Sequence, residues 1–140
     1  MLKPKIYFGH PVNVYDTKLE SNLLKMIESY FPEYEIENPN QPHHAKGYQE
    51  WKEQTGKGMD YYFKKVLPSC IAGVFLPFRD GAWGIGVFGE AKFLADNRHR
   101  IWTINHRGII SLATLEKVQV LSIVETVARI RTSDGQSIPY

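Results

Sequence analysis

Apolar positions near the start of the chain change from strand spacing to helix spacing. The run KIYFG at residues 5–9 is β-branched and aromatic and stops at a glycine, which predicts a strand. In residues 16–31, apolar side chains recur every three or four positions, as in an amphipathic helix. Thr17 and Glu20 have capping-box spacing at the start of this helix, and Pro32 ends it.

The middle of the chain contains its most apolar stretch. Residues 34–40 predict a second strand that runs into an Asn-Pro-Asn turn. Residues 41–58 have no clean period and predict a long surface loop, whereas residues 59–70 have helical spacing. Residues 71–78, IAGVFLPF, are apolar at almost every position, which is typical of a strand covered on both faces. We therefore expect this strand at the centre of a sheet.

The last part of the chain alternates in the same way. A glycine-rich loop over residues 79–89 leads into a short helix over 90–97 and a strand over 100–105. Mixed turns follow, and a second capping-box pattern starts a final helix over 122–131. Strands therefore alternate with helices, and no repeat or linker divides the chain.

This alternation predicts an α/β fold. We expect one domain over residues 1–140, a single doubly wound parallel sheet of four or five strands, flavodoxin-like or Rossmann-like, with helices on both faces. Ligands bind such sheets beyond the carboxyl ends of the strands. That edge would gather residues 9–15, the loop after Asn38, and residues 79–89 and 105–108.

Composition excludes several classes of function. The 140 residues are 43% hydrophobic and 23% charged, as in an ordinary globular domain. A net charge of +2 without a block of like charges gives no footprint for a nucleic acid polymer. No run approaches the ~20 apolar residues of a membrane helix, and residues 1–10 lack the pattern of a signal peptide. We expect a cytoplasmic protein without a membrane partner, and its lone Cys70 as buried filler.

One motif leaves two interpretations open. Gly84, Gly86 and Gly89 in GIGVFGE spell the G-x-G-x-x-G of dinucleotide-binding loops, and Glu90 follows directly. Five residues separate the motif from the apolar strand, and a carboxylate would face the pyrophosphate, so the context disfavours a dinucleotide. The alternative is a loop whose glycines adopt positive φ close to a ligand, with Glu90 ionised in the first turn of a helix. Such a carboxylate is a competent nucleophile, although it can equally be an ordinary first-turn residue.

Several motifs together resemble the nucleoside 2-deoxyribosyltransferase family. They are KIYFG at residues 5–9, Asp60 in MDYYF, GVFLP at 73–77, and the loop RDGAWGIGVFGEAKF that contains Glu90. The resemblance implies cleavage of the N-glycosidic bond of a nucleoside or nucleoside monophosphate. The (deoxy)ribosyl group would pass to another base or to water through Glu90 as the nucleophile. A non-catalytic nucleotide-binding or regulatory domain on the same fold is the alternative.

The resemblance also implies roles for other residues. Asp80 would hold or protonate the leaving base, Asp60 would orient the nucleophile, and Tyr7 would hydrogen-bond to it. Each has a plainer interpretation, because RDG is an ordinary turn, Asp60 can cap a helix, and Tyr7 can be a buried strand aromatic. The expected substrate contacts, with aromatic rings for stacking on a base, are Gly9, His10, Trp83, Gly84, Gly86, Phe88 and Gly89.

Histidines and aromatic residues outside the glycine-rich loop complete the expectations. Adjacent His43 and His44 could contact a base or a phosphate, but solvated loop histidines are the plainer interpretation. Adjacent histidines rarely share one ion without further ligands, so we expect no metal and no cofactor. The resemblance implies a homo-oligomer, for which the candidate interface residues are Trp51, Tyr61, Tyr62 and Trp102.

Overall fold

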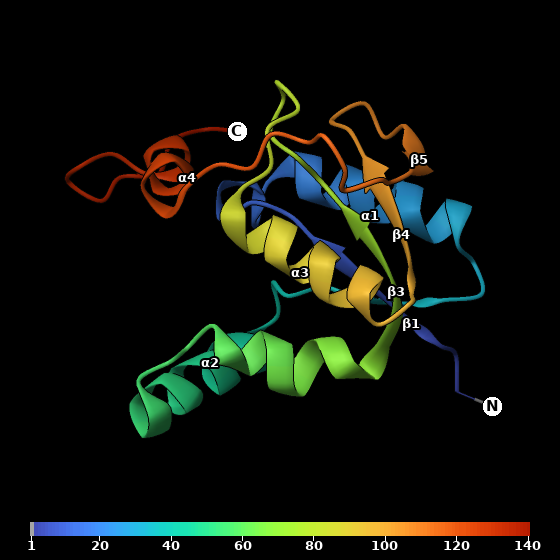
Figure 1. Cartoon of the computed structure of the whole chain (residues 1–140), viewed down its shortest axis with the longest axis horizontal. Helices are drawn as coiled ribbons and strands as arrows, with labels where there is room; N and C mark the ends of the chain where they lie inside the picture. The colour runs from blue at the N-terminus through green and yellow to red at the C-terminus, as the bar shows by residue number, and fades with distance from the viewer. Residues whose placement is uncertain (1) are drawn as a thin grey trace.

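The computed structural model describes residues 2–140, which form a five-stranded sheet of order β2-β1-β3-β4-β5 with helices around it (Figure 1). The strands are β1 (Lys5–Gly9), β2 (Glu35–Glu37), β3 (Cys70–Phe75), β4 (Arg100–Ile104) and β5 (Ile110–Leu112). The first four are parallel, and β3 is the central strand, as its apolar sequence predicts. The α/β fold class is therefore confirmed, with the strand order of flavodoxin-like folds.

The edge strand β5 differs from the expectation of an all-parallel sheet. It pairs antiparallel with β4, with Trp102 opposite Leu112. The connection is a tight turn in which the Gly108 N–H donates to the Asn105 carbonyl, and Gly108 adopts φ 81°. A turn this short reverses the chain, because a parallel neighbour requires a crossover connection of a dozen or more residues.

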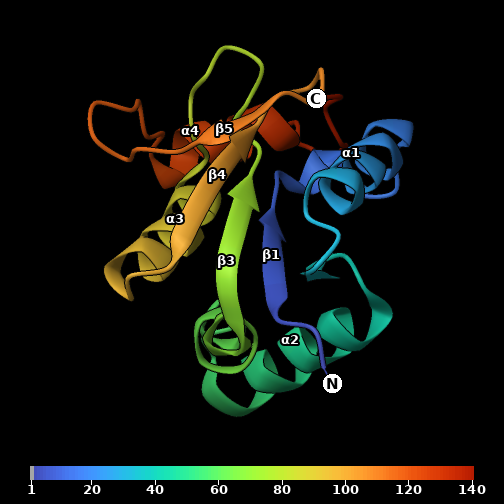
Figure 2. The same ribbon diagram turned by 90° about the vertical axis from the view of Figure 1, so that its right-hand side faces the viewer.

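Helices cover both faces of the sheet. They are α1 (Lys18–Tyr30), α2 (Pro42–Thr55), α3 (Ile85–Asp96) and α4 (Ile123–Ile130), and α1 and α3 lie on opposite faces (Figure 2). The N-cap Thr17 accepts a hydrogen bond from the Glu20 N–H, as predicted for α1. The capping box predicted at the start of α4 is also present. Among residues 2–140, no helix combines the length and apolar character needed to cross a bilayer.

Two of the helical predictions are wrong. The loop expected over residues 41–58 is mostly helix α2, which has Pro42 in its first turn and ends at Gly56 with φ 74°. This helix buries only His44, so it lacks the apolar stripe by which periodicity reveals a helix. Residues 59–70 contain helical turns as expected, but these are a π-helical turn (Tyr62–Val66) and a 3-10 turn (Leu67–Ser69).

The second wrong prediction concerns the start of α3. This helix begins at Ile85, so Gly86 and Gly89 lie inside it and Gly84 is its N-cap. None of these three glycines has positive φ. Nine residues separate β3 from α3, a connection that lacks the tight turn of a dinucleotide-binding loop.

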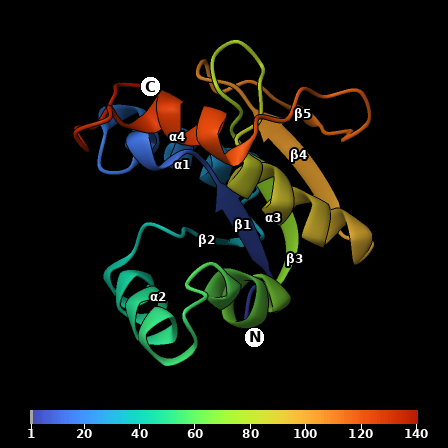
Figure 3. The same ribbon diagram turned by 60° about the vertical axis from the view of Figure 1, so that its left-hand side comes forward.

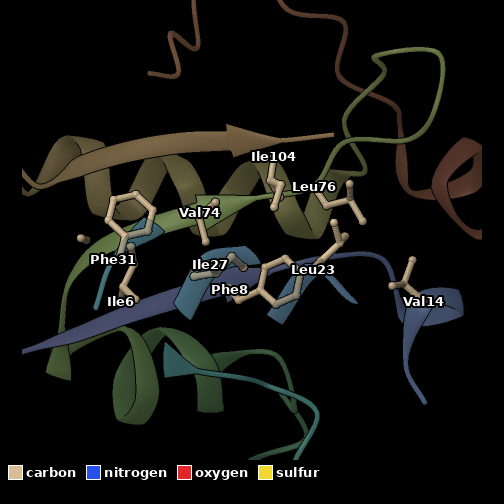
Figure 4. Close-up of a cluster of buried hydrophobic side chains, with 10 residues drawn as sticks. Ile6, Phe8, Val14, Leu23, Ile27, Phe31, Val74, Leu76 and Ile104 are labelled. Carbon is tan, nitrogen blue, oxygen red and sulfur yellow. The ribbon is translucent and has the colours of Figure 1, made fainter. Parts of the chain in front are cut away.

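One hydrophobic core fills the space between the sheet and α1, and a second lies between the sheet and α3. Figure 4 shows Phe8 and Val74 from the sheet meeting Leu23 and Ile27 from α1. Alternation along β1 sends Ile6 and Phe8 to this side and Tyr7 to the face covered by α3, as the sequence predicts. The only cysteine, Cys70, is buried on the α3 side, and burial raises the pKa of its thiol to about 11, so it is filler as expected.

Two similar side chains on α1 test this core. Leu23 is 1% exposed and Met26 is 46% exposed. We expect Leu23→Ala to lower the free energy of unfolding by about 2–5 kcal/mol, because it leaves a cavity under the sheet. Met26→Ala should change it by less than about 0.5 kcal/mol. Urea unfolding of both variants measures the difference, and equal losses would contradict the assigned faces of α1.

Candidate functional site

A cavity of about 490 Å³ lies beside the carboxyl end of β1. Figure 3 shows α2 and α4 on the two sides of this strand end. The wall residues are Ala45, Tyr48 and Gln49 from α2, Thr126 and Ile130 from α4, and Gly86, Val87 and Glu90 from α3. In the sheet, β1 lies between β2 and β3. The chain adds β2 on one side of β1 and then adds β3 on the other side, so the strand order reverses at β1, which is the switch point of the sheet. Ligands of open α/β sheets bind at this switch point, and the volume is that of a small-molecule site, about 300–1,000 Å³.

Glu90 lies deep in this cavity. It is in the second turn of α3 and only 7% exposed, and the Tyr7 hydroxyl donates a 2.5 Å hydrogen bond to Oε2. The predicted hydrogen bond between these two residues is therefore present. Gly9 makes the arrangement possible, since a Cβ there would stand 2.5 Å from the Phe75 ring and 3.2 Å from Glu90 Oε1.

Burial controls the charge of Glu90. Because α3 begins five residues earlier than Glu90, the carboxylate is not at the helix N-terminus and gains no free N–H groups there. Burial instead raises its pKa to about 7, and the hydrogen bond from Tyr7 only partly offsets this. The expectation of a low pKa is wrong. Burial and the neighbouring Glu90 also raise the pKa of Tyr7, which keeps its proton and remains the donor.

His10 lines the cavity as predicted, but its ring nitrogens are occupied. Nδ1 lies 2.9 Å from the Phe8 carbonyl and Nε2 lies 2.7 Å from Glu20 Oε2. Both partners are oxygen acceptors, and the Glu20 carboxylate pairs with Nε2. Burial raises the pKa of Glu20, but hydrogen bonds from His10 and Asn40 outweigh this and lower it overall. Both ring nitrogens of His10 are therefore engaged by protein oxygens, and the residue is held in place by Phe8 and Glu20.

The aromatic wall differs from the one that the sequence predicts. Trp83 is 2% exposed in the core beneath α3, and Phe88 packs edge-on against it with ring centroids 6.2 Å apart. Neither ring lines the cavity; Tyr15, Tyr48, Tyr62 and Phe78 do. The tyrosines were missed because Tyr48 is on the unpredicted helix α2, and Tyr62 faces the cavity only through the π-helical turn.

The structure does not bring the two predicted aspartates to Glu90. Asp80 makes a bidentate pair with Arg129, with both N···O distances 2.8 Å, and this holds its pKa down at about 2. Asp60 Oδ2 lies 3.9 Å from the Nζ atom of Lys64, which is one turn further along the chain. Neither aspartate lines the cavity, and Asp80 is instead joined to α4 through Arg129.

The predicted glycines divide into two groups. Gly84 and Gly86 line the cavity, where Gly86 leaves open space that a side chain would fill. Gly9 lies beside Glu90, and Gly89 instead faces Phe63, at 3.5 Å from where its Cβ would be. Gly9 and Gly89 therefore do not line the cavity, and the structure does not place them for the direct substrate contacts that the sequence predicts.

No family model, curated protein or solved structure matches the chain. The fold and the geometry alone define the class, an α/β domain with a buried glutamate in a tyrosine-lined cavity at the switch point of its sheet.

The raised pKa of Glu90 predicts a pH dependence of stability. An unfolded glutamate has a pKa of about 4.3, whereas Glu90 in the folded chain has one of about 7. The folded state thus binds the proton more tightly, and its stability falls as pH rises from about 4.3 to 7, by up to about 3 kcal/mol. Because glutamine does not titrate, the free energy of unfolding of Glu90→Gln should not show this decrease with pH. The variant should therefore be more stable than the wild type at pH 8.

Urea unfolding between pH 4.5 and 8 measures this difference. Glu116→Gln, at an exposed position, is the matched control and should follow the wild type. A constant difference between the wild type and Glu90→Gln across this range would show that Glu90 does not titrate there.

Proposed function

We propose that the cavity binds a nucleoside or nucleoside monophosphate and that Glu90 cleaves its N-glycosidic bond. The observation that carries this proposal is a buried carboxylate, held by Tyr7, in a cavity of small-molecule size. Tyr7 occupies Oε2, while Oε1 makes no hydrogen bond among residues 2–140 and is left for a ligand.

This placement suits capture of a sugar. As the bond from the anomeric carbon to the base breaks, its electron pair leaves with the base and positive charge develops on the sugar. Oε1 of ionised Glu90 can stabilise that charge and form an ester with the anomeric carbon. Water or a second base then displaces the carboxylate from the opposite face, so the configuration is retained overall.

The remaining wall residues support an aromatic, weakly charged ligand. Tyr15, Tyr48 and Tyr62 offer rings for a flat base and hydroxyls for its polar edge. Arg131 lines the cavity and can meet a 5′-phosphate.

One observation favours the alternative of a non-catalytic nucleotide-binding domain. Among residues 2–140, Glu90 is the only carboxylate lining the cavity, and the expected second acid, Asp80, is paired with Arg129. If Glu90 is the nucleophile, the leaving base must therefore be protonated by solvent or by a tyrosine that lines the cavity.

The test is turnover with a panel of nucleosides and nucleoside 5′-monophosphates, with free base detected by chromatography. We expect Glu90→Gln to lower the rate by several orders of magnitude while it still binds the ligand. Because the attacking carboxylate must be ionised, the wild-type rate should rise with pH up to about 7. Tyr7→Phe removes a hydrogen bond that lowers the pKa of Glu90, so this rise should move to higher pH.

A 2-fluoro sugar substrate identifies the nucleophile, because it slows breakdown of the ester. Intact mass should increase by one sugar, and peptide mapping should place the sugar on Glu90. A label on another residue rules out Glu90 as the nucleophile. Ligand binding without turnover, retained in Glu90→Gln, favours the non-catalytic alternative.

We also propose that the chain forms a homo-oligomer. On α4, beside the cavity, Ile123 and Val124 are 68% and 78% exposed, which is unusual for aliphatic side chains on one helix. Sedimentation at micromolar concentration should give at least twice the mass of one chain, 16.1 kDa, and Val124→Asp should lower it. A mass of about one chain for the wild type removes the proposal.

A further inference from the structure

Three potential metal ligands meet where β2 is joined to α2, outside the cavity. Glu37 ends β2, and His43 and His44 lie in the first turn of α2. One ligand atom from each lies within 4.8 Å of the others. The paired histidines lack a third ligand in the sequence, and the fold supplies it from Glu37.

We propose that Glu37, His43 and His44 bind a divalent transition metal ion, with zinc the best match. Two histidines and a glutamate form a ligand set that zinc uses, with water in the fourth position of a tetrahedron. Glu37 and His44 are buried, whereas His43 is exposed, so the site is reached from solvent on its His43 side.

The hydrogen bonds of His44 prepare it for this role. Its Nδ1 lies 2.8 Å from the Tyr61 hydroxyl, and its Nε2 is in close contact with Glu37 Oε1. If Nδ1–H donates to the Tyr61 hydroxyl, it makes the outer hydrogen bond typical of ligating histidines, and Nε2 is left with its lone pair beside Glu37 Oε1. Nε2 and Glu37 Oε1 are then both available as ligands for a cation bound beside them.

Charge makes Glu37 indispensable to the site. The positive end of the α2 dipole and Lys5, whose Nζ lies 3.6 Å from Glu37 Oε2, both oppose a bound cation. The Glu37 carboxylate is the only negative ligand of the three. The site should therefore depend on this charge, and not only on the shape of the side chain.

The site has a structural consequence. It would join the end of β2 to the first turn of α2, and the next turns of α2 carry the cavity wall residues Ala45 and Tyr48. None of the three ligands lines the cavity. Metal binding therefore fixes the position of α2, and its test does not depend on the reaction proposed for Glu90.

Calorimetric titration of the chelator-treated full chain with Zn²⁺ at pH 7.5 tests the proposal. We expect saturable binding of one ion per chain. His43→Ala and Glu37→Gln should each weaken zinc binding by more than about 10-fold, and Tyr61→Phe by about 10-fold through loss of the outer hydrogen bond. His99→Ala, which changes a histidine in the turn between α3 and β4, should bind like the wild type.

Co²⁺ provides a second measurement. Its visible absorption should show a low-coordinate site in the wild type and disappear in His43→Ala, which changes an exposed side chain and leaves the fold intact. No saturable zinc binding would overturn the proposal. Binding unchanged in His43→Ala and Glu37→Gln, or weakened equally in His99→Ala, would overturn it as well.

Discussion

The site depends on burial of a single carboxylate between α3 and β1. Within the described part of the chain, residues 2–140, Glu90 has one hydrogen bond, from Tyr7. The loss of hydration exceeds what that bond returns, so the pKa of Glu90 rises to about 7. An acid in this condition is poised between its two forms near neutral pH, which a group at the protein surface is not. Two glycines make this burial possible. Gly9 has no side chain to collide with the Glu90 carboxylate, and Gly86 leaves space in the cavity for a ligand.

The sheet topology explains why this carboxylate faces a cavity. Strand β1 supplies Tyr7, and the loop after it supplies His10, which is fixed by Glu20 from α1. Helix α3 follows the neighbouring strand β3 and brings Glu90 to the same edge. Four segments thus meet at one strand end, where hydrogen bonds join Tyr7 to Glu90 and His10 to Glu20.

The features that the sequence predicted well are those with local causes. The central strand β3 was recognised from continuous apolar character, and α1 and α4 from side-chain caps that act within four residues. Helix α2 could not be found in this way, since it buries only one residue. The start of α3 was misplaced because Gly86 and Gly89 weaken a helix on their own and are tolerated here by packing and by the cavity.

Long-range contacts decided the rest of the site. Tyr7 and Glu90 were paired through a family resemblance, and the structure provides that contact across 83 positions. The pairing of Asp80 with Arg129 and the burial of His44 beside Glu37 have no signal in the spacing of the chain, because each joins segments that only the tertiary fold brings together.

The weak attachment of α2 has a dynamic consequence. Since only His44 of this helix is buried, opening of α2 exposes little apolar surface and should require far less free energy than global unfolding. The helix is then a cooperative unit of its own, whose amide hydrogens exchange through local opening while those of β1 and β3 exchange only through global unfolding. Because α2 contributes one wall of the cavity, a ligand can enter by displacing this helix while the sheet stays folded.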